Sequence, residues 1–244
     1  MGDYDSSTYG ERIADMYDAW YQGGDPDPIV ERLQALAGDG PVLELGIGTG
    51  RIALPLAATG VTIHGIDASP AMVEKLHSKP GGESIPVTIG DFAEFELVER
   101  FSLAFVVFNT FFGILEQRDQ VRSFQCVAEH LAPGGRFLLE CFVPDLGRFD
   151  RGQRLAVSAN ETQRNRREAS LYDPVRQHVK GQVVSMTESG SRFYPLQVRY
   201  AWPSELDLMA QLAGLELEHR WGGWNEEPFT AASGLHLSVY RKPG

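Results

Sequence analysis

An apolar run that ends in three closely spaced glycines constrains this chain most. Residues 40–56 read GPVLELGIGTGRIALPL, with glycine at positions 46, 48 and 50. The residues before the glycines predict a buried strand, and those after them predict a helix. A glycine-rich turn between a strand and a helix lets a ligand approach the bare main chain and the free N–H groups of the helix N-terminus. The run therefore predicts a ligand-binding turn at the end of a strand.

Strands and helices alternate after this turn. The expected strands are almost continuously apolar, which is typical of a parallel sheet covered by helices on both faces. We therefore expect a doubly wound, Rossmann-like α/β fold with a mostly parallel, seven-stranded sheet. The expected strands are 41–46, 61–67, 85–90, 101–109, 136–143, 215–221 and 235–242, and the expected helices are 50–59, 70–78, 117–131 and 203–213.

The alternation fails between residues 144 and 200, where three strand-like segments are joined by turn residues. We expect a small antiparallel β insertion here, after the fifth strand of the core. Residues 1–143 and 201–244 would then form the core, and residues 144–200 would form a lid over the substrate. The strand-like segments are Leu155–Gln163, Arg176–Thr187 and Arg192–Trp202, with turns at Tyr172-Asp173-Pro174 and Ser189-Gly190.

The first residues predict a helix with an aromatic stripe. Thr8 and Glu11 have the spacing of a capping box, and Tyr9, Tyr17 and Trp20 follow at helical spacing. Such a stripe packs against a core or covers a ligand. A second helix is expected from Pro28 to its stop at Gly38, because proline favours the first turn of a helix and glycine its end.

The glycine pattern excludes two common phosphate sites. A P-loop needs Gly-Lys-Ser/Thr at its end, but Arg51 and Ile52 follow Gly50. The dinucleotide fingerprint has its third glycine five residues after the first, a position that Arg51 occupies here. The remaining pattern is E-L-G-x-G-x-G, with Glu44 inside the strand.

Acidic and aromatic residues end the following strands. Asp67 lies about 20 residues after the glycines, where a carboxylate is well placed to accept hydrogen bonds from ribose hydroxyls. Asp91 and Phe92 end the third strand, where a carboxylate and a ring suit an adenine amino group and base. Asn109 ends the fourth strand. These positions predict an adenosine-containing ligand.

The ordered set ELGIGTG (44–50), Asp67, GDF (90–92) and LAPGGRFLLE (131–140) resembles the class I S-adenosylmethionine-dependent methyltransferases. The resemblance covers most of residues 40–143 and implies S-adenosyl-L-methionine as cofactor. It also implies that glycines hold the methionine part, Asp67 the ribose, and Asp91 and Phe92 the adenine. The expected cofactor-binding residues are Tyr17, Glu44, Gly46, Gly48, Gly50, Asp67, Ala68, Met72, Asp91, Phe92 and Asn109.

The methyl acceptor is expected to be a small molecule with an amine as the favoured nucleophile. The segment MYDAWY (16–21) resembles the start of small-molecule N-methyltransferases of bacterial secondary metabolism, which act on aminosugars or on a peptide α-amine. Methyl transfer needs alignment and exclusion of water, and an amine only has to be neutral. The expected catalytic residues are Tyr17, Asn109, Glu140 and His178, and the expected substrate-binding residues are Tyr9, Tyr21, Phe111, Phe112, Arg176, Arg199 and Trp202.

The insertion is basic, with ten basic and five acidic residues between positions 148 and 200. The excess fits either a solvated sheet face or arginines that bind an anionic acceptor. An O- or C-methyltransferase is the nearest alternative and needs a base, for which His178 and His236 are candidates. A non-catalytic protein that binds the cofactor as a sensor or scaffold is a third hypothesis.

The net charge of −11 disfavours nucleic acid as a partner, because a phosphate backbone needs a basic surface. The longest apolar run is too short for a membrane span, and the N-terminus has no apolar signal segment. Two cysteines in apolar stretches indicate a reducing cytoplasm, and no residue spacing suggests a metal site. We expect a cytoplasmic monomer or homodimer.

Overall fold

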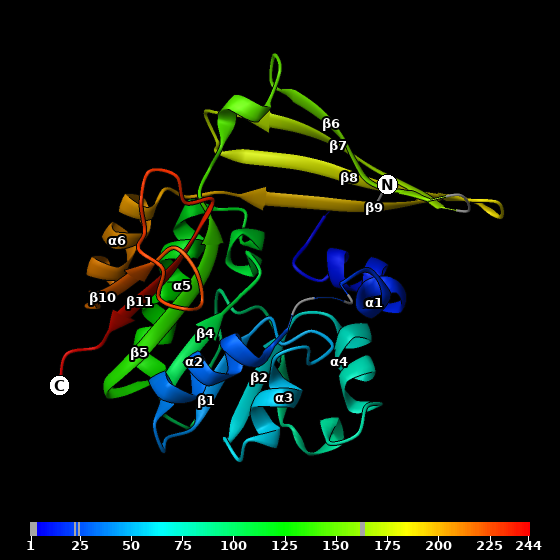
Figure 1. Cartoon of the computed structure of the whole chain (residues 1–244). Helices are drawn as coiled ribbons and strands as arrows, with labels where there is room; N and C mark the ends of the chain where they lie inside the picture. Colours follow the sequence, from blue (N-terminus) through cyan, green and yellow to red (C-terminus); the bar gives the residue numbers. More distant parts are fainter. Residues whose placement is uncertain (1–3, 22, 24, 162–163) are drawn as a thin grey trace.

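Seven strands form one mostly parallel sheet in the computed structural model, which describes residues 4–21, 23, 25–161 and 164–244 (Figure 1). Their order is β10-β11-β5-β4-β1-β2-β3. Strands β1 to β5 run parallel, whereas β11 is antiparallel to both of its neighbours. The predicted fold is thereby confirmed. The strands are β1 (Val42–Leu45), β2 (Ile63–Asp67), β3 (Val87–Ile89), β4 (Phe101–Val106), β5 (Leu131–Phe142), β10 (Glu216–Trp221) and β11 (Leu235–Arg241).

Helices cover both faces of this sheet and bury two hydrophobic cores. Successive residues of β1 point to opposite faces, so Leu43 packs in one core and Val42 in the other. Helices α5 and α6 cover the first face, and α2 and α3 cover the second. This double cover explains why the strands are apolar throughout. The helices are α2 (Asp27–Ala37), α3 (Ala53–Ala58), α4 (Pro70–His77), α5 (Gln117–His130) and α6 (Pro203–Leu212).

A second, antiparallel sheet lies over the carboxyl ends of the parallel strands (Figure 1). It is inserted between β5 and α6, as the sequence predicts, and we call it the insertion sheet. Its order follows the chain, and β9 is the strand nearest to the core. The strands are β6 (Gln153–Glu161), β7 (Arg164–Asp173), β8 (His178–Thr187) and β9 (Gly190–Arg199).

The prediction of three strands in the insertion was wrong, because β7 is a fourth. Its sequence, RNRREASLYD, is polar on both faces and lacks the apolar alternation that marks a strand. The strand forms because it pairs with β6 on one side and with β8 on the other. The first expected strand ran to Gln163, which lies outside the described residues.

Helix α1 (Thr8–Trp20) lies between α4 and β9 and joins the core to the insertion sheet (Figure 1). Gly10 allows the close approach to α4, since a Cβ atom there would lie 2.5 Å from the Ser69 side chain. On the other side, the Trp20 ring packs edge-on against Tyr194 of β9, with centroids 4.6 Å apart. The helix therefore covers the space below the insertion sheet.

The predicted capping box at Thr8 and Glu11 was wrong. Helix α1 begins at Thr8, after Ser7, whose side chain makes no capping bond. The Asp5 carboxylate instead accepts hydrogen bonds from the Ser7 and Thr8 amides (3.0 and 2.9 Å) and from the Thr8 hydroxyl (2.8 Å). Glu11 turns toward α4, where its carboxylate accepts hydrogen bonds from the Ser69 hydroxyl (2.7 Å) and the Ala71 amide (3.1 Å). Asp5 thus caps the helix, and Glu11 joins it to α4.

Candidate active site

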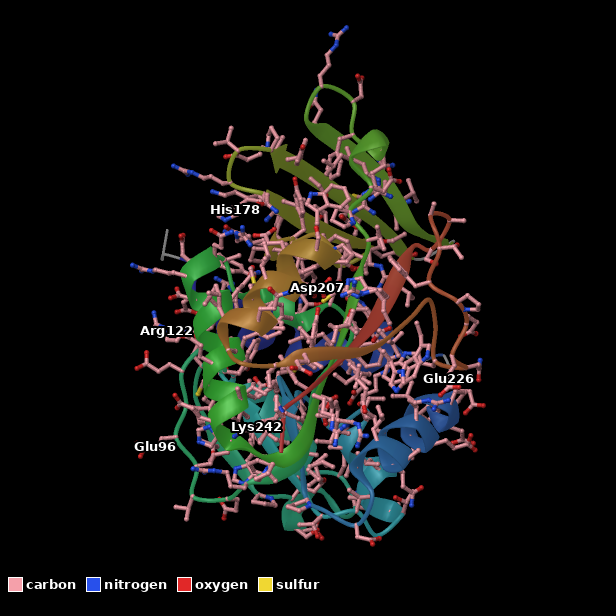
Figure 2. The ribbon with its side chains drawn as sticks, turned by 90° about the vertical axis from the view of Figure 1, so that its left-hand side faces the viewer. Glu96, Arg122, His178, Asp207, Glu226 and Lys242 are labelled. Carbon is pink, nitrogen blue, oxygen red and sulfur yellow. The ribbon has the colours of Figure 1, made fainter. Side chains whose placement is uncertain are left out.

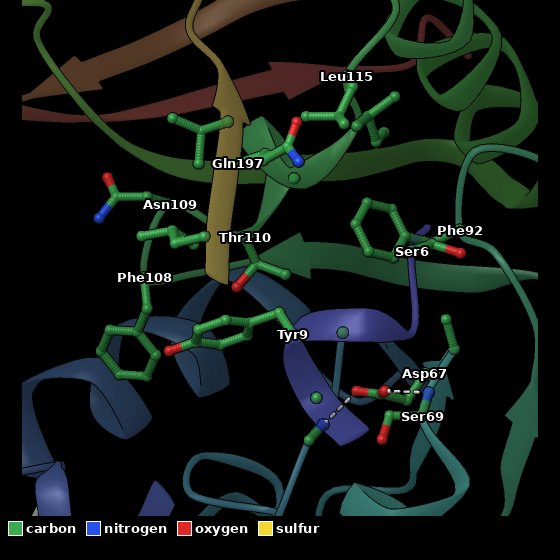
Figure 3. A pocket seen from close by; sticks show the side chains of 18 of the residues that line it. Ser6, Tyr9, Asp67, Ser69, Phe92, Phe108, Asn109, Thr110, Leu115 and Gln197 are labelled. Carbon is green, nitrogen blue, oxygen red and sulfur yellow. Dashed lines mark hydrogen bonds between the residues drawn. The ribbon is translucent and has the colours of Figure 1, made fainter. Parts of the chain in front are cut away.

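A cavity of about 610 Å³ lies where the carboxyl ends of the parallel strands meet α1 and the insertion sheet (Figure 3). Ligand pockets for molecules of drug size have volumes of ~300–1,000 Å³. Its walls come from the glycine-rich turn, the ends of β2 to β5, the segment 4–21, and β7 to β9. Carboxyl ends of parallel strands are where α/β folds bind ligands, so the cavity lies where the fold predicts a site.

The glycine-rich turn forms the floor of the cavity through Gly46 and Gly48. Both have positive φ values, of 72° and 56°, which favour glycine. A Cβ atom on Gly48 would have no neighbour closer than 3.9 Å, so its main chain faces open space. Gly50 does not line the cavity, and a Cβ atom there would lie 2.3 Å from Leu76. The third glycine thus serves close packing of the turn on α4.

Asp67 holds the shape of this turn and also lines the cavity (Figure 3). One carboxylate oxygen accepts a hydrogen bond from the Gly48 amide (2.7 Å), and the other accepts one from the Ser69 amide (2.8 Å). Burial raises the pKa of Asp67, and these two bonds oppose the rise. Each oxygen keeps a lone pair for a ligand hydroxyl, as a ribose site requires.

Glu44 lies behind the turn with only 3% of its surface exposed. Its Oε2 atom has no hydrogen-bond partner among the described residues. Burial raises the pKa of Glu44 well above its usual value, and the nearby charge of Asp67 raises it further. A buried carboxyl with an unpartnered oxygen is costly unless a ligand group pairs with it, which fits a cationic group of the cofactor.

Asp91 and Phe92 lie together at the other end of the cavity, after β3. Asp91 is exposed, and one of its oxygens accepts a hydrogen bond from the Ala93 amide over 2.9 Å. The Phe92 ring is buried beside Gly46. Ala68 and Met72 of the β2–α4 connection also line the cavity. These predicted cofactor residues therefore share one wall with Asp67.

A strained turn after β4 places Phe108 and Asn109 in the cavity wall. Their φ values of 56° and 64° are rare for residues other than glycine. Two side chains hold the turn: the Phe142 amide donates to Asn109 Oδ1 (2.6 Å), and the Phe108 amide donates to Glu140 Oε2 (2.8 Å). Strain held by such contacts is typical of functional sites.

Glu140 lines the cavity at the end of β5 and is mostly buried. Its second oxygen accepts a hydrogen bond from Trp224 Nε1 over 3.4 Å. Burial raises the pKa of Glu140, while the hydrogen bonds from Phe108 and Trp224 and the charge of Arg51 oppose the rise. Its visible contacts support the turn, so Glu140 is first of all a positioning residue.

Three tyrosines on one face of α1 form the roof near the glycine-rich turn. The hydroxyls of Tyr9 and Tyr21 lie 3.1 Å apart, and the rings of Tyr17 and Tyr21 lie 4.8 Å apart. Burial raises the pKa of Tyr17 to about 12, with Tyr21 as the next cause. Burial raises the pKa values of Tyr9 and Tyr17, so their hydroxyls stay protonated at neutral pH and can orient a ligand by hydrogen bonds.

Eight predicted residues lie outside the cavity lining, and two of them, Glu44 and Gly50, are described above. Phe111 and Phe112 are fully buried in the hydrophobic core below α5. Trp202 packs edge-on against Tyr200 ahead of α6, and Arg176 is exposed in the turn between β7 and β8. The remaining two, Arg199 and His178, make buried or interface contacts described next.

Arg199 and His178 join the insertion sheet to the core. The Arg199 guanidinium is buried and donates to Gln120 (2.5 Å), Gln177 (3.1 Å) and Glu205 (2.7 Å). His178 lies where the insertion sheet meets the upper end of α5 (Figure 2), and its Nε2 donates to the Leu115 carbonyl over 2.8 Å. Neither residue lines the cavity, and the Nε2 atom of His178 keeps its proton in this contact, so neither residue is placed for the expected role.

Sequence reasoning missed Arg51, Phe108 and Arg148, which line the cavity. The Arg51 guanidinium stacks over the Phe108 ring, 4.2 Å from its centroid. Arg51 directly follows the last glycine of the motif, and this position could have identified it as a residue of the site. The other candidate base, His236, is fully buried, with its Nδ1 hydrogen-bonded to the Ser238 hydroxyl over 2.9 Å.

Comparisons with known proteins agree with this geometry. Residues 42–135 match the methyltransferase domain family. The structure of the CcbJ methyltransferase from Streptomyces caelestis is 40% identical, with a TM-score of 0.92, and the match covers 99% of this chain and 100% of that one. The chain belongs to the S-adenosylmethionine-dependent methyltransferases.

Two other relatives extend the comparison. The cypemycin N-terminal methyltransferase of Streptomyces sp is 29% identical over 204 residues, which is 82% of each chain. The sugar N-methyltransferase KedS8 from Streptoalloteichus sp has a TM-score of 0.69 at 20% identity, over 100% of this chain and 99% of that one, and shares the fold. The predicted family resemblance is confirmed, including its secondary-metabolism N-methyltransferases.

The methyltransferase uses S-adenosylmethionine as its cofactor. The cavity fits this molecule, because the bare main chain of Gly48 and the carboxyl of Asp67 line one end of a space of suitable volume, and the unpartnered oxygen of Glu44 lies behind the same turn. No three His, Cys, Asp or Glu side chains group as metal ligands within the described ranges. No helix of the described chain is long and apolar enough to cross a membrane.

Proposed function

We propose that this methyltransferase transfers a methyl group from S-adenosylmethionine to an amine nitrogen of a small-molecule acceptor. The observation that carries the proposal is the chemistry of the cavity lining. The titratable side chains that line the cavity are carboxyls, tyrosines and arginines. No histidine is among the described residues that line it. A hydroxyl or carbon acceptor needs a base to remove its proton, whereas a neutral amine brings its own lone pair. The lining therefore suits an amine better than the alternatives.

The charge of the lining supports the same acceptor. Seven carboxyl side chains line the cavity, against two arginines. Such a surface attracts a cationic amine and repels an anionic acceptor. The basic residues between positions 148 and 200 would favour an anionic acceptor only if they reached the cavity. Arg148 does line it, but neither Arg176 nor Arg199 does, and the carboxyl side chains still outnumber the arginines. The carboxyl residues are Asp5, Asp67, Asp91, Glu116, Asp119, Glu140 and Glu168.

The similarity to the cypemycin N-terminal methyltransferase also favours nitrogen as the nucleophile. That relative's name refers to an N-terminus, and a terminal α-amine has the same nucleophilic atom as an aminosugar. The cavity is closed above by β7 to β9 and beside them by α1. A small acceptor, or the terminus of a peptide, would fit between these elements.

The residues of the chain would act by alignment and by exclusion of water. Bound S-adenosylmethionine supplies the methyl group: the amine lone pair forms the new N–C bond, the C–S bond breaks, and its electron pair goes to sulfur. Gly46, Gly48 and Asp67 would hold the donor, while Tyr17 and Asn109 would orient the acceptor. Glu140 would keep the turn that carries Asn109 in place. The ammonium product can release its proton to water.

The insertion sheet would then act as the lid of the active site. Glu168, Val179 and Leu196 point from it into the cavity, and Tyr4 of the N-terminal segment accepts a hydrogen bond from the Gln197 amide (3.2 Å). We infer a division into a cofactor-binding core, residues 1–143 and 201–244, and a substrate lid, residues 144–200. A cytoplasmic location follows from the need for S-adenosylmethionine.

The proposal is tested with purified protein, methyl-labelled S-adenosylmethionine and a panel of amines, phenols and carboxylic acids. Label on nitrogen supports it, and label only on oxygen or carbon overturns it. The His178→Ala variant is the matched control, because His178 is the alternative base and makes one contact to a main-chain carbonyl. We expect this variant to keep its turnover number; a loss of turnover in a folded variant would favour O- or C-methylation. Cofactor binding without transfer to any acceptor would favour a sensor.

A further inference from the structure

We propose that Arg51 binds the α-carboxylate of S-adenosylmethionine, and that this contact makes the enzyme reject the decarboxylated cofactor. The inference rests on the use of S-adenosylmethionine and is independent of the acceptor. Four observations support it: the place of Arg51 beside the glycine-rich turn, the way its side chain is held, the charges of the cavity, and the chemistry of the cofactor.

Arg51 is the first residue after the three glycines and lines the same cavity as Gly46 and Gly48. Its side chain is half-buried between the end of β4 and the segment that follows α1. The resemblance to other methyltransferases assigns the glycines to the methionine part of the cofactor. Arg51 therefore lies at the amino-acid end of the binding site, away from the wall that contains Asp91 and Phe92.

The guanidinium of Arg51 is held on two sides. Its plane lies over the Phe108 ring at 4.2 Å, and its Nη2 donates to the Gly23 carbonyl over 3.2 Å. A hydrogen bond from Arg51 also opposes the rise in the pKa of Tyr17, so the Tyr17 hydroxyl is a further partner of the guanidinium. A guanidinium has five N–H donors, so these contacts still leave donors for a carboxylate. Stacking lowers the freedom of the side chain and so reduces the entropy lost on binding. The guanidinium of Arg51 is therefore held in place before the cofactor binds.

The charges of the lining leave one place for an anionic group near the glycines. Seven carboxyls and two arginines line the cavity, and Arg148, the second arginine, precedes the insertion sheet, where its guanidinium lies over Phe149. Asp67 and Glu140 line the cavity near the glycine-rich turn and Glu44 lies behind it, whereas Arg51 is the positive side chain at this end, and its charge opposes the rise in the pKa of Glu140. A carboxylate placed anywhere else at this end would meet like charges.

The cofactor has the complementary pattern. Its amino-acid end contains an ammonium and a sulfonium, which suit the carboxyls, and one carboxylate, which suits Arg51. Decarboxylated S-adenosylmethionine keeps both positive groups and lacks the carboxylate. It would leave Arg51 without an anionic partner. It would also add no anion to balance the charges of its ammonium and sulfonium groups. The site is thus built for the zwitterionic form of the cofactor.

The experiment measures binding of both cofactors to the whole protein by calorimetry, without any acceptor. We expect the wild-type protein to prefer S-adenosylmethionine by at least about tenfold, the usual effect of a charge-assisted hydrogen-bond pair. Arg51→Met should lower affinity for S-adenosylmethionine by a similar factor and leave affinity for the decarboxylated form unchanged or higher. Arg51→Lys should fall between them, because lysine keeps the charge and loses the fork.

Arg32→Met is the matched control, because Arg32 also stacks over an aromatic ring, Trp221 at 5.1 Å, but does not line the cavity. It should bind both cofactors like the wild-type protein. Equal loss of both cofactors in Arg51→Met, or no loss of either, would overturn the proposal. If Arg51→Met does not fold, the wild-type comparison still decides, because equal affinity for both cofactors contradicts the inference.

Discussion

The Thr49 hydroxyl donates a hydrogen bond to the Asp18 carboxylate over 2.6 Å, which fastens α1 to the glycine-rich turn. Lys79 completes a small network, since its ammonium contacts Asp18 at 2.7 Å and donates to the Thr49 carbonyl at 2.7 Å. The tyrosines of α1 and the glycines line the same cavity. In the proposed site the cofactor would lie between these two elements, which Asp18 holds together, and we expect cofactor exchange to require that this contact opens.

Replacement of Asp18 by alanine should weaken cofactor binding more than it lowers stability. The contact is partly exposed, so we expect a change of about 1 kcal/mol in binding free energy, near fivefold in the dissociation constant. Stopped-flow fluorescence should show faster cofactor dissociation. Asp15→Ala is the control, because Asp15 pairs with Lys75 on the outer side of the same helix and is 80% exposed. A similar effect in both variants would contradict the specific role of Asp18.

Glu44 should make the stability of the ligand-free enzyme depend on pH. Its pKa is raised in the folded state, so the native protein takes up a proton at a pH where the unfolded chain is ionised. The free energy of unfolding should then fall as pH rises from about 4.5 through the folded pKa. Glu44→Gln removes this cost, so its advantage over the wild-type protein should grow with pH and reach about 1 kcal/mol or more at pH 8.

Denaturant unfolding at pH 5 and at pH 8 measures this difference. The surface variant Glu83→Gln is the control, because Glu83 is exposed and its replacement should leave the two curves parallel to those of the wild type. Glu140 also has a raised pKa and contributes equally to wild type and variant, whereas Asp67, whose charge raises the pKa of Glu44, is part of the same pH effect. Parallel pH dependence of wild type and Glu44→Gln would show that Glu44 carries no such cost.

The fold could be predicted from the sequence because each inner strand is buried on both faces. Runs such as FSLAFV of β4 are apolar apart from Ser102, and turn residues separate them from amphipathic helices. Strand β7 could not be predicted in the same way, since its order comes from pairing with β6 and β8 and not from its own side chains. A regular alternation of apolar and polar residues indicates a strand with one buried face. Strand β7 is polar on both faces, so its sequence shows little alternation.

The cofactor end of the site followed from local motifs, whereas the acceptor end depends on tertiary contacts. Phe111 and Phe112 looked like cavity residues, but the two positive φ values at Phe108 and Asn109 turn the chain so that both rings enter the core. Arg199 looked like an anion site, but its guanidinium pairs with Gln120, 79 residues away in the sequence, and with Glu205 of α6. A single sequence shows neither which residues adopt positive φ values nor which residues distant in the chain come into contact.

Arg199 should therefore affect stability and not acceptor affinity. Arg199→Met removes the centre of a buried network and leaves Glu205 and Gln120 short of a partner, so the free energy of unfolding should fall by about 2 to 5 kcal/mol. At a temperature where the variant is folded, KM for an amine acceptor should be close to the wild-type value. Arg176→Ala, an exposed arginine of the same sheet, should change neither quantity. A raised KM with unchanged stability would restore the anion-site hypothesis.

Gly48 and Gly50 should respond differently to alanine although they lie two residues apart. Both have positive φ values, which cost an L residue ~1 kcal/mol. In Gly50→Ala the new methyl would also overlap Leu76, so we expect a loss of about 2 to 4 kcal/mol in stability. In Gly48→Ala the methyl enters open space of the cavity, so stability should fall by only about 1 kcal/mol.

Cofactor affinity should show the opposite order, because the methyl of Gly48→Ala occupies space that the methionine part of S-adenosylmethionine needs. Thermal unfolding with and without the cofactor measures both effects, since a ligand that binds the native state raises the melting temperature according to its affinity. We expect the cofactor to stabilise Gly50→Ala nearly as much as the wild-type protein and to stabilise Gly48→Ala much less. An equal cofactor effect on both variants would mean that Gly48 does not face the bound cofactor.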